Sequence, residues 1–402
     1  MSCDLVGQTG SDYRRYTVSD KTNNLHLRPI GESSERKEDS FMHKRLVRNE
    51  RTFLARRYAH FPLLLLGFLV LTPLSRAQGN LGPITVGAGL QASYTGTSPT
   101  GGDFNNQFAL NHARIYISGP VTEGIKFMLN TDYDSVTNKL TVLDAVAQIG
   151  VSPKFNIWFG RFLEPSDRAN LYGPFFSHEW NVYTDGIQDG YPFVHQGRDN
   201  GVAYWGDFAK VKVSVGAFDG KSATGKSNII GAARVQVDFW DKEDGYYLNG
   251  TYYGDKNLLA VGGASQLQDG RTASTIDFLL EKKVLNGGAF SIESEYSNYN
   301  RLGGYDAAYA KSQGAYGLAS FLFPKVVPIG KFKGKFEILG KYAKADFTHG
   351  ATPSYYQKTS EVNFNYVIKQ FNARVMTFFQ DVRFNRMQTN FWKAGIGLQI
   401  QM

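Results

Sequence analysis

The chain has 402 residues, with 44 Lys and Arg against 36 Asp and Glu and a formal net charge of +8. A mean hydropathy of −0.32 excludes a helical membrane protein, and the single cysteine, Cys3, excludes a disulfide framework. Aromatic residues make up 14% of the chain and 43 residues are glycine, a composition that favours strands joined by turns.

The N-terminal region has the pattern of an export signal. The apolar stretch FPLLLLGFLVLTPL (61–74) is about 14 residues long, too short to span a bilayer as a helix. It follows a basic region and precedes Ser75-Arg76-Ala77, whose small residues suit a signal peptidase. We predict a signal peptide over 42–77, cleaved after Ala77. Residues 1–41 are interpreted as a polar extension, either disordered or a wrongly assigned start. A buried or anchoring helix at 61–74 is the alternative.

Most of the net charge belongs to this leader. Residues 1–77 hold 13 of the 44 basic and 8 of the 36 acidic residues, which leaves 31 and 28, or +3, for 78–402. The sequence pI of about 9.2 is therefore no argument for nucleic-acid binding, and we expect no nucleic-acid partner.

From residue 84 onward, segments of about 10 residues alternate apolar and polar side chains with a period of two, which predicts strands. In chain order these segments are 84–95, 109–119, 124–134, 141–151, 155–162, 198–206, 210–219, 228–240, 257–268, 272–284, 289–299, 312–323, 332–345, 358–369, 372–384 and 391–402. The stretch 245–253 also has strand character. We interpret it as part of a long turn, because a further strand would break the alternation of short and long connections.

Sixteen segments with short connections at one end and longer, Gly-rich ones at the other predict an all-β fold over 78–402. This fold is a 16-stranded antiparallel transmembrane β-barrel with short periplasmic turns and long external loops. A sheet in lipid cannot leave free edges, so 391–402 is expected to pair with the first strand and to turn its apolar face to lipid. A soluble β-sandwich or a propeller is the alternative, but no linker and no repeat of about 40 residues is visible.

Three stretches carry a resemblance to a known family. NHARIYISGPVTEGIKFMLNTDYD, LDAVAQIGVSPKFNIWFGRFLEPSDRANL and GRDNGVAYWGDFAKVKVSVGAFDG resemble hairpins of the phosphate-selective porin (porin O and P) family. The resemblance extends from about residue 80 to 402. It implies a homotrimeric outer-membrane channel of 16 strands, with the third external loop folded into the pore. Two features depart from the family pattern: the family's rows of arginine and lysine along the pore cannot be placed here, and the last residue is Met402 rather than an aromatic.

Strand parity assigns side chains to the inside of the barrel. The inward set contains ten basic and ten acidic residues, and a balanced lumen predicts weak selectivity. The candidate pore-lining residues are Arg114, Lys126, Asp144, Lys212, Arg234, Asp277, Glu293, Lys333, Lys335, Lys341, Glu361, Arg374 and Lys393. Lys333, Lys335 and Lys341 could form a local basic cluster, or they could be a solvated face at the periplasmic rim.

The longest external loop, 164–196, is the candidate constriction, because a loop of this length in a compact fold is usually functional. Its candidate residues, with one just beyond it, are Glu164, Asp167, Arg168, Glu179, Trp180, Asp185, Asp189 and Arg198. The acidic balance argues against a dedicated phosphate filter. The aromatic residues of the loop could pin it to the wall, or they could form a slide for sugars.

Other motifs predict nothing further. GKSATGKS (220–227) matches a P-loop, but a strand pattern follows where a phosphate-binding helix is needed. His178-Glu179 lacks the second histidine of a zinc site, and no Ser/His/Asp set is brought together. We therefore expect no enzyme, cofactor or metal.

The function expected is a weakly selective outer-membrane porin for small hydrophilic solutes. Its partners would be outer-membrane lipid and lipopolysaccharide, the barrel-assembly machinery, and small solutes or anions in transit. An anion or phosphate porin, and a barrel enzyme or adhesin, are the alternatives.

Overall fold

The computed structural model describes residues 83–134, 138–187, 197–221, 227–304, 309–350 and 353–402. The predicted polar extension and signal peptide, 1–41 and 42–77, lie outside the described residues.

The described chain forms 16 strands, and each predicted segment corresponds to one of them. The strands are β1 (Thr85–Pro99), β2 (Asn105–Thr122), β3 (Ile125–Asp134), β4 (Lys139–Ser152), β5 (Phe155–Leu163), β6 (Arg198–Phe208), β7 (Val211–Lys221), β8 (Ser227–Asp238), β9 (Leu258–Gln268), β10 (Arg271–Val284), β11 (Gly288–Asn300), β12 (Tyr309–Ile329), β13 (Phe332–Gly350), β14 (Tyr355–Lys369), β15 (Ala373–Phe384) and β16 (Phe391–Gln401). The helical elements are α3 (Arg168–Tyr172) and the single 3-10 turns η2 (Pro174–Phe176) and η3 (Leu285–Gly287).

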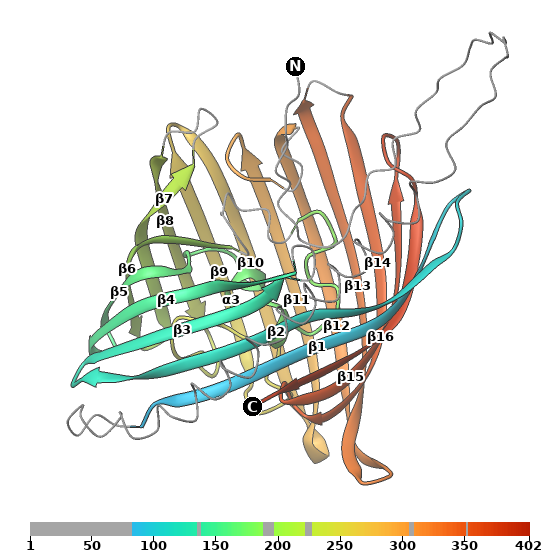
Figure 1. The fold of residues 1–402 in the computed structure, drawn as a ribbon, viewed down its shortest axis with the longest axis horizontal. Helices are drawn as coiled ribbons and strands as arrows, with labels where there is room; N and C mark the ends of the chain where they lie inside the picture. The colour runs from blue at the N-terminus through green and yellow to red at the C-terminus, as the bar shows by residue number, and fades with distance from the viewer. Residues whose placement is uncertain (1–82, 135–137, 188–196, 222–226, 305–308, 351–352) are drawn as a thin grey trace, which may run out of the picture. The chain divides into compact units, whose positions relative to one another are not determined.

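The strands form one closed antiparallel barrel in which each strand pairs with its neighbours in sequence (Figure 1). β1 pairs with β16 from Gly89 opposite Gln401 to Pro99 opposite Phe391, so the last strand closes the ring as predicted. Closure pairs the backbone of both edges, which an open sheet would leave exposed. No helix in the described part of the chain is long and apolar enough to cross a membrane.

The two faces of the barrel wall differ in polarity. On β16, Ile396, Leu398 and Ile400 are 47%, 40% and 49% exposed on the outside, whereas Gln399 between them is fully buried on the inside. Because side chains alternate along a strand, one register fixes which residues face outward along the whole element. The outer face is accordingly apolar around most of the ring.

Connections at the rim that holds the C-terminus are mostly short, as predicted, for example at 123–124, 153–154 and 330–331. The β8–β9 connection, 239–257, is a long exception at this rim. Its stretch 245–253 forms no strand, in agreement with the interpretation as a turn. At the opposite rim β9 and β10 are joined only by Asp269 and Gly270, both in left-handed conformation, so that rim also mixes short and long connections. The longest connection there is 164–197, between β5 and β6.

The interior is not uniformly polar. A cluster of buried hydrophobic side chains joins the inner faces of β4 to β8 with residues of 164–197 and 239–257, and consists of Val146, Trp158, Phe162, Leu163, Leu171, Ala203, Phe218, Ala232, Tyr246 and Leu248. Trp158 lies with its ring centroid 4.8 Å from that of Tyr246. Because burial of each large apolar side chain contributes about 1.5–3 kcal/mol, this cluster holds both segments inside the barrel.

Candidate functional site

The segment 164–187 crosses the barrel interior and bonds to the wall opposite its origin. Tyr172 donates a hydrogen bond to Glu293 Oε1 on β11 at 3.0 Å, and Gln357 on β14 donates to the Thr184 carbonyl at 2.9 Å. Gln399 on β16 donates to the Phe175 carbonyl at 2.9 Å. The connection between β5 and β6 therefore narrows the space that the strands enclose.

A second segment, 239–257, enters from the opposite rim and meets the first. The Gly250 amide donates to the Phe176 carbonyl of the first segment at 2.8 Å, and the Tyr246 hydroxyl donates at 2.7 Å to the carbonyl of Leu163, the last residue of β5. The structure thus has two inserted segments, 164–187 and 239–257, which touch inside the barrel.

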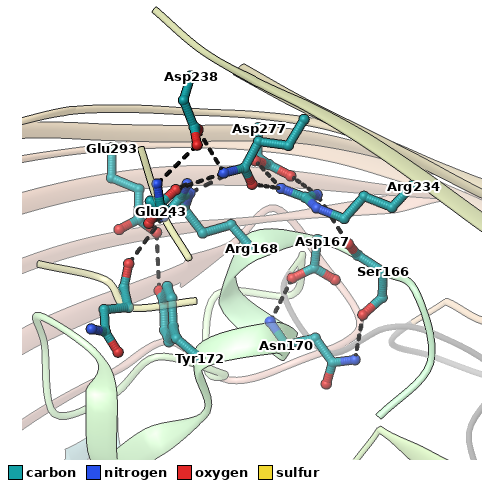
Figure 2. A network of polar contacts seen from close by, with 12 residues as sticks. Ser166, Asp167, Arg168, Asn170, Tyr172, Arg234, Asp238, Glu243, Asp277 and Glu293 are labelled. Carbon is teal, nitrogen blue, oxygen red and sulfur yellow. Dashed lines mark hydrogen bonds and ion pairs between the residues drawn. The ribbon is translucent and has the colours of Figure 1, made fainter. Parts of the chain in front are cut away.

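A cluster of opposite charges joins the inserted segments to β8 and β10 (Figure 2). Arg168 donates to both carboxylate oxygens of Glu243, and its Nε lies 3.8 Å from Asp277. Arg234 binds Asp277 through two bonds of 2.5 and 2.9 Å, and its Nη1 also donates to the Ser166 carbonyl at 3.0 Å. Two-bond arginine–carboxylate geometry is strong and directional, so this cluster fixes the position of the first inserted segment.

Burial raises the pKa of carboxyl groups in the inserted segments, and a facing arginine reverses this effect at one of them. Burial raises the pKa of Glu243, but the facing Arg168 guanidinium outweighs it and the net pKa is lowered. Burial raises the pKa of Asp167 to about 7 although the Asn170 amide donates to it. Burial, helped by the charge of Asp199, also raises the pKa of Glu164 well above its usual value. The Arg168 guanidinium therefore favours the ionised form of Glu243, whereas burial favours the protonated form of Glu164.

Aromatic side chains of the first inserted segment pack against the wall. The Trp180 ring stacks on Phe378 with centroids 6.4 Å apart and planes at 5°. Phe175 lies under the Arg114 guanidinium at 4.9 Å, and the Phe176 ring lies 5.2 Å from that of Phe371. These contacts favour the pinning interpretation of the loop aromatics over a sugar slide.

Most of the candidate residues lie inside the barrel and are buried against other protein groups. The buried ones are Arg114, Asp144, Glu164, Asp167, Arg168, Glu179, Asp185, Arg198, Lys212, Arg234, Asp277, Glu293, Lys341, Glu361 and Arg374. Arg114 pairs with Asp132 at 3.0 Å and Arg198 with Asp144 at 2.9 Å. Asp189 lies outside the described residues.

The three lysines of the expected basic cluster have different surroundings. Lys341 is buried between Glu179 and Asp185 at 2.9 and 2.8 Å. Lys335 is half-buried and donates to the Gly287 carbonyl at 2.5 Å, and Lys333 is exposed near the turn rim. Lys341 therefore serves as an anchor for the inserted segment, while the other two lysines belong to the rim.

The remaining candidates lie at less enclosed positions. Lys126 is exposed, and Lys393 and Trp180 are half-buried. Arg374 contacts no carboxylate at ion-pair distance in the described chain, and instead donates to the Ser177 carbonyl at 2.6 Å and to Tyr253 Oη at 3.0 Å. It therefore binds both inserted segments through neutral oxygens.

The second inserted segment contains none of the residues predicted from the sequence to line or narrow the pore. Glu243, Tyr246, Leu248, Tyr252 and Tyr253 were not among the candidates, yet all five are buried or half-buried inside the barrel. The sequence pattern that could have indicated this segment is the presence of adjacent tyrosines in a long connection, 239–257, at the rim where the other connections are short. Large aromatic side chains in a connection usually have something to pack against.

The P-loop match is followed by strand β8 and not by a helix, and its residues 222–226 lie outside the described chain.

His178 is fully buried, and burial together with the Arg374 charge lowers its pKa to about 3. His178 is therefore neutral near physiological pH.

Comparison with solved structures finds bacterial porins. The anion-selective porin from Comamonas acidovorans aligns with a TM-score of 0.54 and 11% identity over 80% of this chain and 99% of that chain. Salmonella typhi OmpF in complex with daunomycin aligns at 0.54 with 12% identity over 79% and 97%. The high-pH structure of Pseudomonas putida OprB aligns at 0.53 with 10% identity over 79% and 94%.

The sequence matches no protein-family model and no curated protein. The resemblance to phosphate-selective porins is thus supported at the level of the porin fold and not at the level of that family. At identities near one in ten, the structural likeness establishes the 16-stranded barrel fold of outer-membrane porins.

Proposed function

We propose that this chain is an outer-membrane channel through which small hydrophilic solutes diffuse, with weak selectivity among ions. The observation that carries the proposal is the closed 16-stranded barrel, apolar outside and charged inside, with inserted segments that narrow its interior. A closed sheet satisfies every backbone group in lipid, and an inner face of paired charges suits hydrated solutes.

The charges inside argue for weak selectivity and against a strong anion filter. The inward arginines bind carboxylates or backbone carbonyls, as Arg234 binds Asp277 and Arg374 binds the Ser177 carbonyl. In the described residues, Glu293 and Glu361 form no ion pair with any basic side chain. An anion-selective pore needs a one-sided basic ring, so the phosphate alternative has less support.

The experiment is a reversal-potential measurement across a KCl gradient with the purified protein in a planar bilayer. We expect steady conductance and a potential near zero or slightly toward the potassium side. A clear chloride-side potential would instead make the anion porin the better description. Absence of conductance would favour an enzyme or adhesin built on the same barrel.

Export and assembly are separate parts of the proposal. Cleavage after Ala77 is testable by mass spectrometry of the N-terminus of protein recovered from outer membranes. The homotrimer implied by the family resemblance is testable by cross-linking in the membrane before extraction.

A further inference from the structure

The second inserted segment, 239–257, extends across the ring of strands from one wall to the other. Near its start, Tyr246 belongs to the hydrophobic cluster that contains Ala203 on β6. Near its end, Tyr253 belongs to a second buried cluster, which contains Val367 on β14. β6 and β14 are eight places apart in the closed ring of 16 strands, so they stand on opposite sides of the interior (Figure 1). The segment is therefore a bar across the interior and not a loop folded against its own wall.

The interior around this bar is closely packed. Each of the 16 strands has at least one inward side chain that is buried, for example Gln91 on β1, Asp277 on β10 and Gln399 on β16. Inward side chains of a wide water-filled channel would be in contact with water instead. The described arrangement is therefore a narrow one, and a wider passage requires that one of the two inserted segments move.

The two inserted segments are attached to the wall in different ways. In the first segment, Glu179 and Asp185 pair with Lys341 on β13 at 2.9 and 2.8 Å. In the described chain, the second segment forms no ion pair with a strand: its ion pairs join its own residues or lead to Arg168 of the first segment. Hydrogen bonds and packing alone hold the second segment on the wall. Its release leaves no buried wall charge without a partner, so it is the segment that moves at lower cost.

Two glycines bound the central part of the second segment. Gly245 and Gly254 have φ of +85° and +83°, in the left-handed region that favours glycine. A side chain built at Gly245 would meet nothing within 4 Å, so this end has room to rotate. Each glycine amide donates to a carboxylate of the wall, Gly245 to Asp207 Oδ2 at 3.2 Å and Gly254 to Glu281 Oε1 at 2.7 Å. A few such backbone positions at the ends of an element are the usual form of a hinge.

Glu281 on β10 holds most of the polar contacts at the second hinge. Its fully buried carboxyl group accepts from the Thr251 hydroxyl and the Tyr252 amide, both at 2.8 Å, besides the Gly254 amide. Three donors of the segment therefore meet one acceptor group of the wall. Loss of that group would release all three contacts at once, and a buried donor without an acceptor is unfavourable.

We propose that residues 246–253 form a gate that is hinged at Gly245 and Gly254 and latched by Glu281. The proposal rests on the channel function and adds its regulation. In the narrow state the gate lies across the ring, as described here, and in the wide state it turns out toward the rim of the short turns. Glu281 is a positioning residue, because it acts through the gate and not on the solute.

Cysteine labelling tests whether the gate moves. In the full chain with Cys3→Ser, which removes the single native cysteine, Leu248→Cys places a buried thiol on the gate. Val182→Cys is the matched control, because Val182 is equally buried in the first inserted segment, in a cluster with Ala169 and Tyr172. A water-soluble maleimide should label the gate position roughly tenfold faster, since only the gate opens locally. Equal rates at the two positions, or no reaction at either, would overturn the proposal.

A reversible lock tests whether the gate controls the current. A Cβ built at Gly250 would lie 3.3 Å from Ser177 Cα, so Ser177→Cys with Gly250→Cys can form a disulfide between the two inserted segments. In a planar bilayer we expect a steady lower level and brief openings to a higher one. The oxidised double variant should show only the lower level, and dithiothreitol should restore the higher one. Each single variant, treated in the same way, is the control for the new side chains.

Glu281→Gln tests the latch without a new covalent bond. Glutamine keeps one acceptor oxygen but turns an NH₂ group toward the donors of the gate, so the fraction of time at the higher level should rise roughly tenfold. Glu295→Gln is the control, because Glu295 is a buried inward glutamate on β11 that accepts from Ser297 of its own strand. Equal level occupancy in Glu281→Gln and the wild type would contradict the latch.

The outcomes separate the two proposals. If maleimide labels the gate position faster but no variant conducts, the channel function fails and the moving gate stands. If all variants conduct at one level that the disulfide does not change, the gate fails and the channel stands.

Discussion

Arg168 and Glu243 form a fully buried, two-contact ion pair between segments that enter the barrel from opposite rims. Neither residue belongs to the wall. Their pairing means that each inserted segment is held in part by the other, so the width of the interior depends on both. A buried pair is costly to break from one side, because the charge that remains loses its two closest contacts.

Glu243→Gln tests this dependence. Loss of the charge should destabilise the contact between the inserted segments by about 3–5 kcal/mol and leave the closed barrel intact. The released segments should make single-channel conductance larger and noisier. Arg168→Met combined with Glu243→Met should restore part of the wild-type behaviour, because removing both partners leaves no orphan charge. Lys242→Gln is the control, since it removes a solvent-exposed pair with Asp244. Unchanged conductance in Glu243→Gln would show that the segments stay in place without the pair.

Leu248→Ala tests the hydrophobic anchor of the second segment. Leu248 is 2% exposed and belongs to the cluster with Trp158 and Leu171. Truncation of Leu248 should lower the stability of the packed segment 239–257 by about 2–5 kcal/mol. The strands should lose little stability. Limited proteolysis should then cut this segment while the strands remain protected. Leu285→Ala, at an 85% exposed turn position, is the matched control and should leave the digestion pattern unchanged.

Gly397→Ala tests how closely the first segment fits the wall. A Cβ at Gly397 would lie 2.5 Å from the Trp180 ring, closer than any real contact allows. The ring must move, and we expect a loss of about 1–3 kcal/mol, visible as a lower unfolding temperature in detergent. Gly231→Ala is the control, because its nearest neighbour would be the Leu267 carbonyl at 3.9 Å. Adding Trp180→Ala to Gly397→Ala should recover part of the loss; if it does not, the clash with the ring is not the cause.

The strands could be predicted from sequence because their signal is local. A period of two, as in Ile396, Leu398 and Ile400 against Gln399, depends only on one strand having a lipid face and an inner face. The closing pair β1–β16 followed from the physical need to leave no edge in lipid.

The interior could not be predicted in the same way, because its contacts join residues far apart in the chain. Trp158 and Phe162 point inward against Tyr246, a residue of a connection that parity cannot place inside or outside. Lys341 was grouped with Lys333 and Lys335 by sequence spacing. Its partners Glu179 and Asp185 come from a segment more than 150 residues earlier, so the spacing along β13 carried no information about them.

Asp167 predicts a pH dependence of stability. A carboxyl that titrates near 3.9 in an unfolded chain titrates at about 7 in the folded protein. Between these values the folded state holds a proton that the unfolded state lacks. The free energy of unfolding therefore falls as pH rises from about 4 to about 7, by at most about 4 kcal/mol. Below about pH 4 the stabilisation is complete, and above about pH 7 it is lost.

Asp167→Asn isolates this contribution. Asparagine keeps an oxygen for the Asn170 amide at the start of α3 but does not titrate in this range. The measurement is the unfolding midpoint of wild type and variant in detergent between pH 4 and pH 8. The difference between the two should change with pH below 7 and become constant above it. Parallel curves throughout would mean that Asp167 does not hold the extra proton.

Glu361→Gln tests whether the carboxylates inside the barrel give the channel a preference for cations. Glu361 accepts from Asn181 at 3.1 Å and from Gln380 at 2.8 Å, and forms no ion pair with a basic side chain in the described residues. Removal of the Glu361 charge should shift the reversal potential toward the chloride side. The cation-to-anion permeability ratio should fall roughly twofold to fivefold, which corresponds to ~0.4–1 kcal/mol of lost attraction between the carboxylate and a passing cation. Asp381→Asn, on the outer face of β15, removes the same charge outside the interior and should leave the ratio unchanged. Equal shifts in both variants would mean that the whole-protein charge, and not the interior carboxylates, sets ion preference.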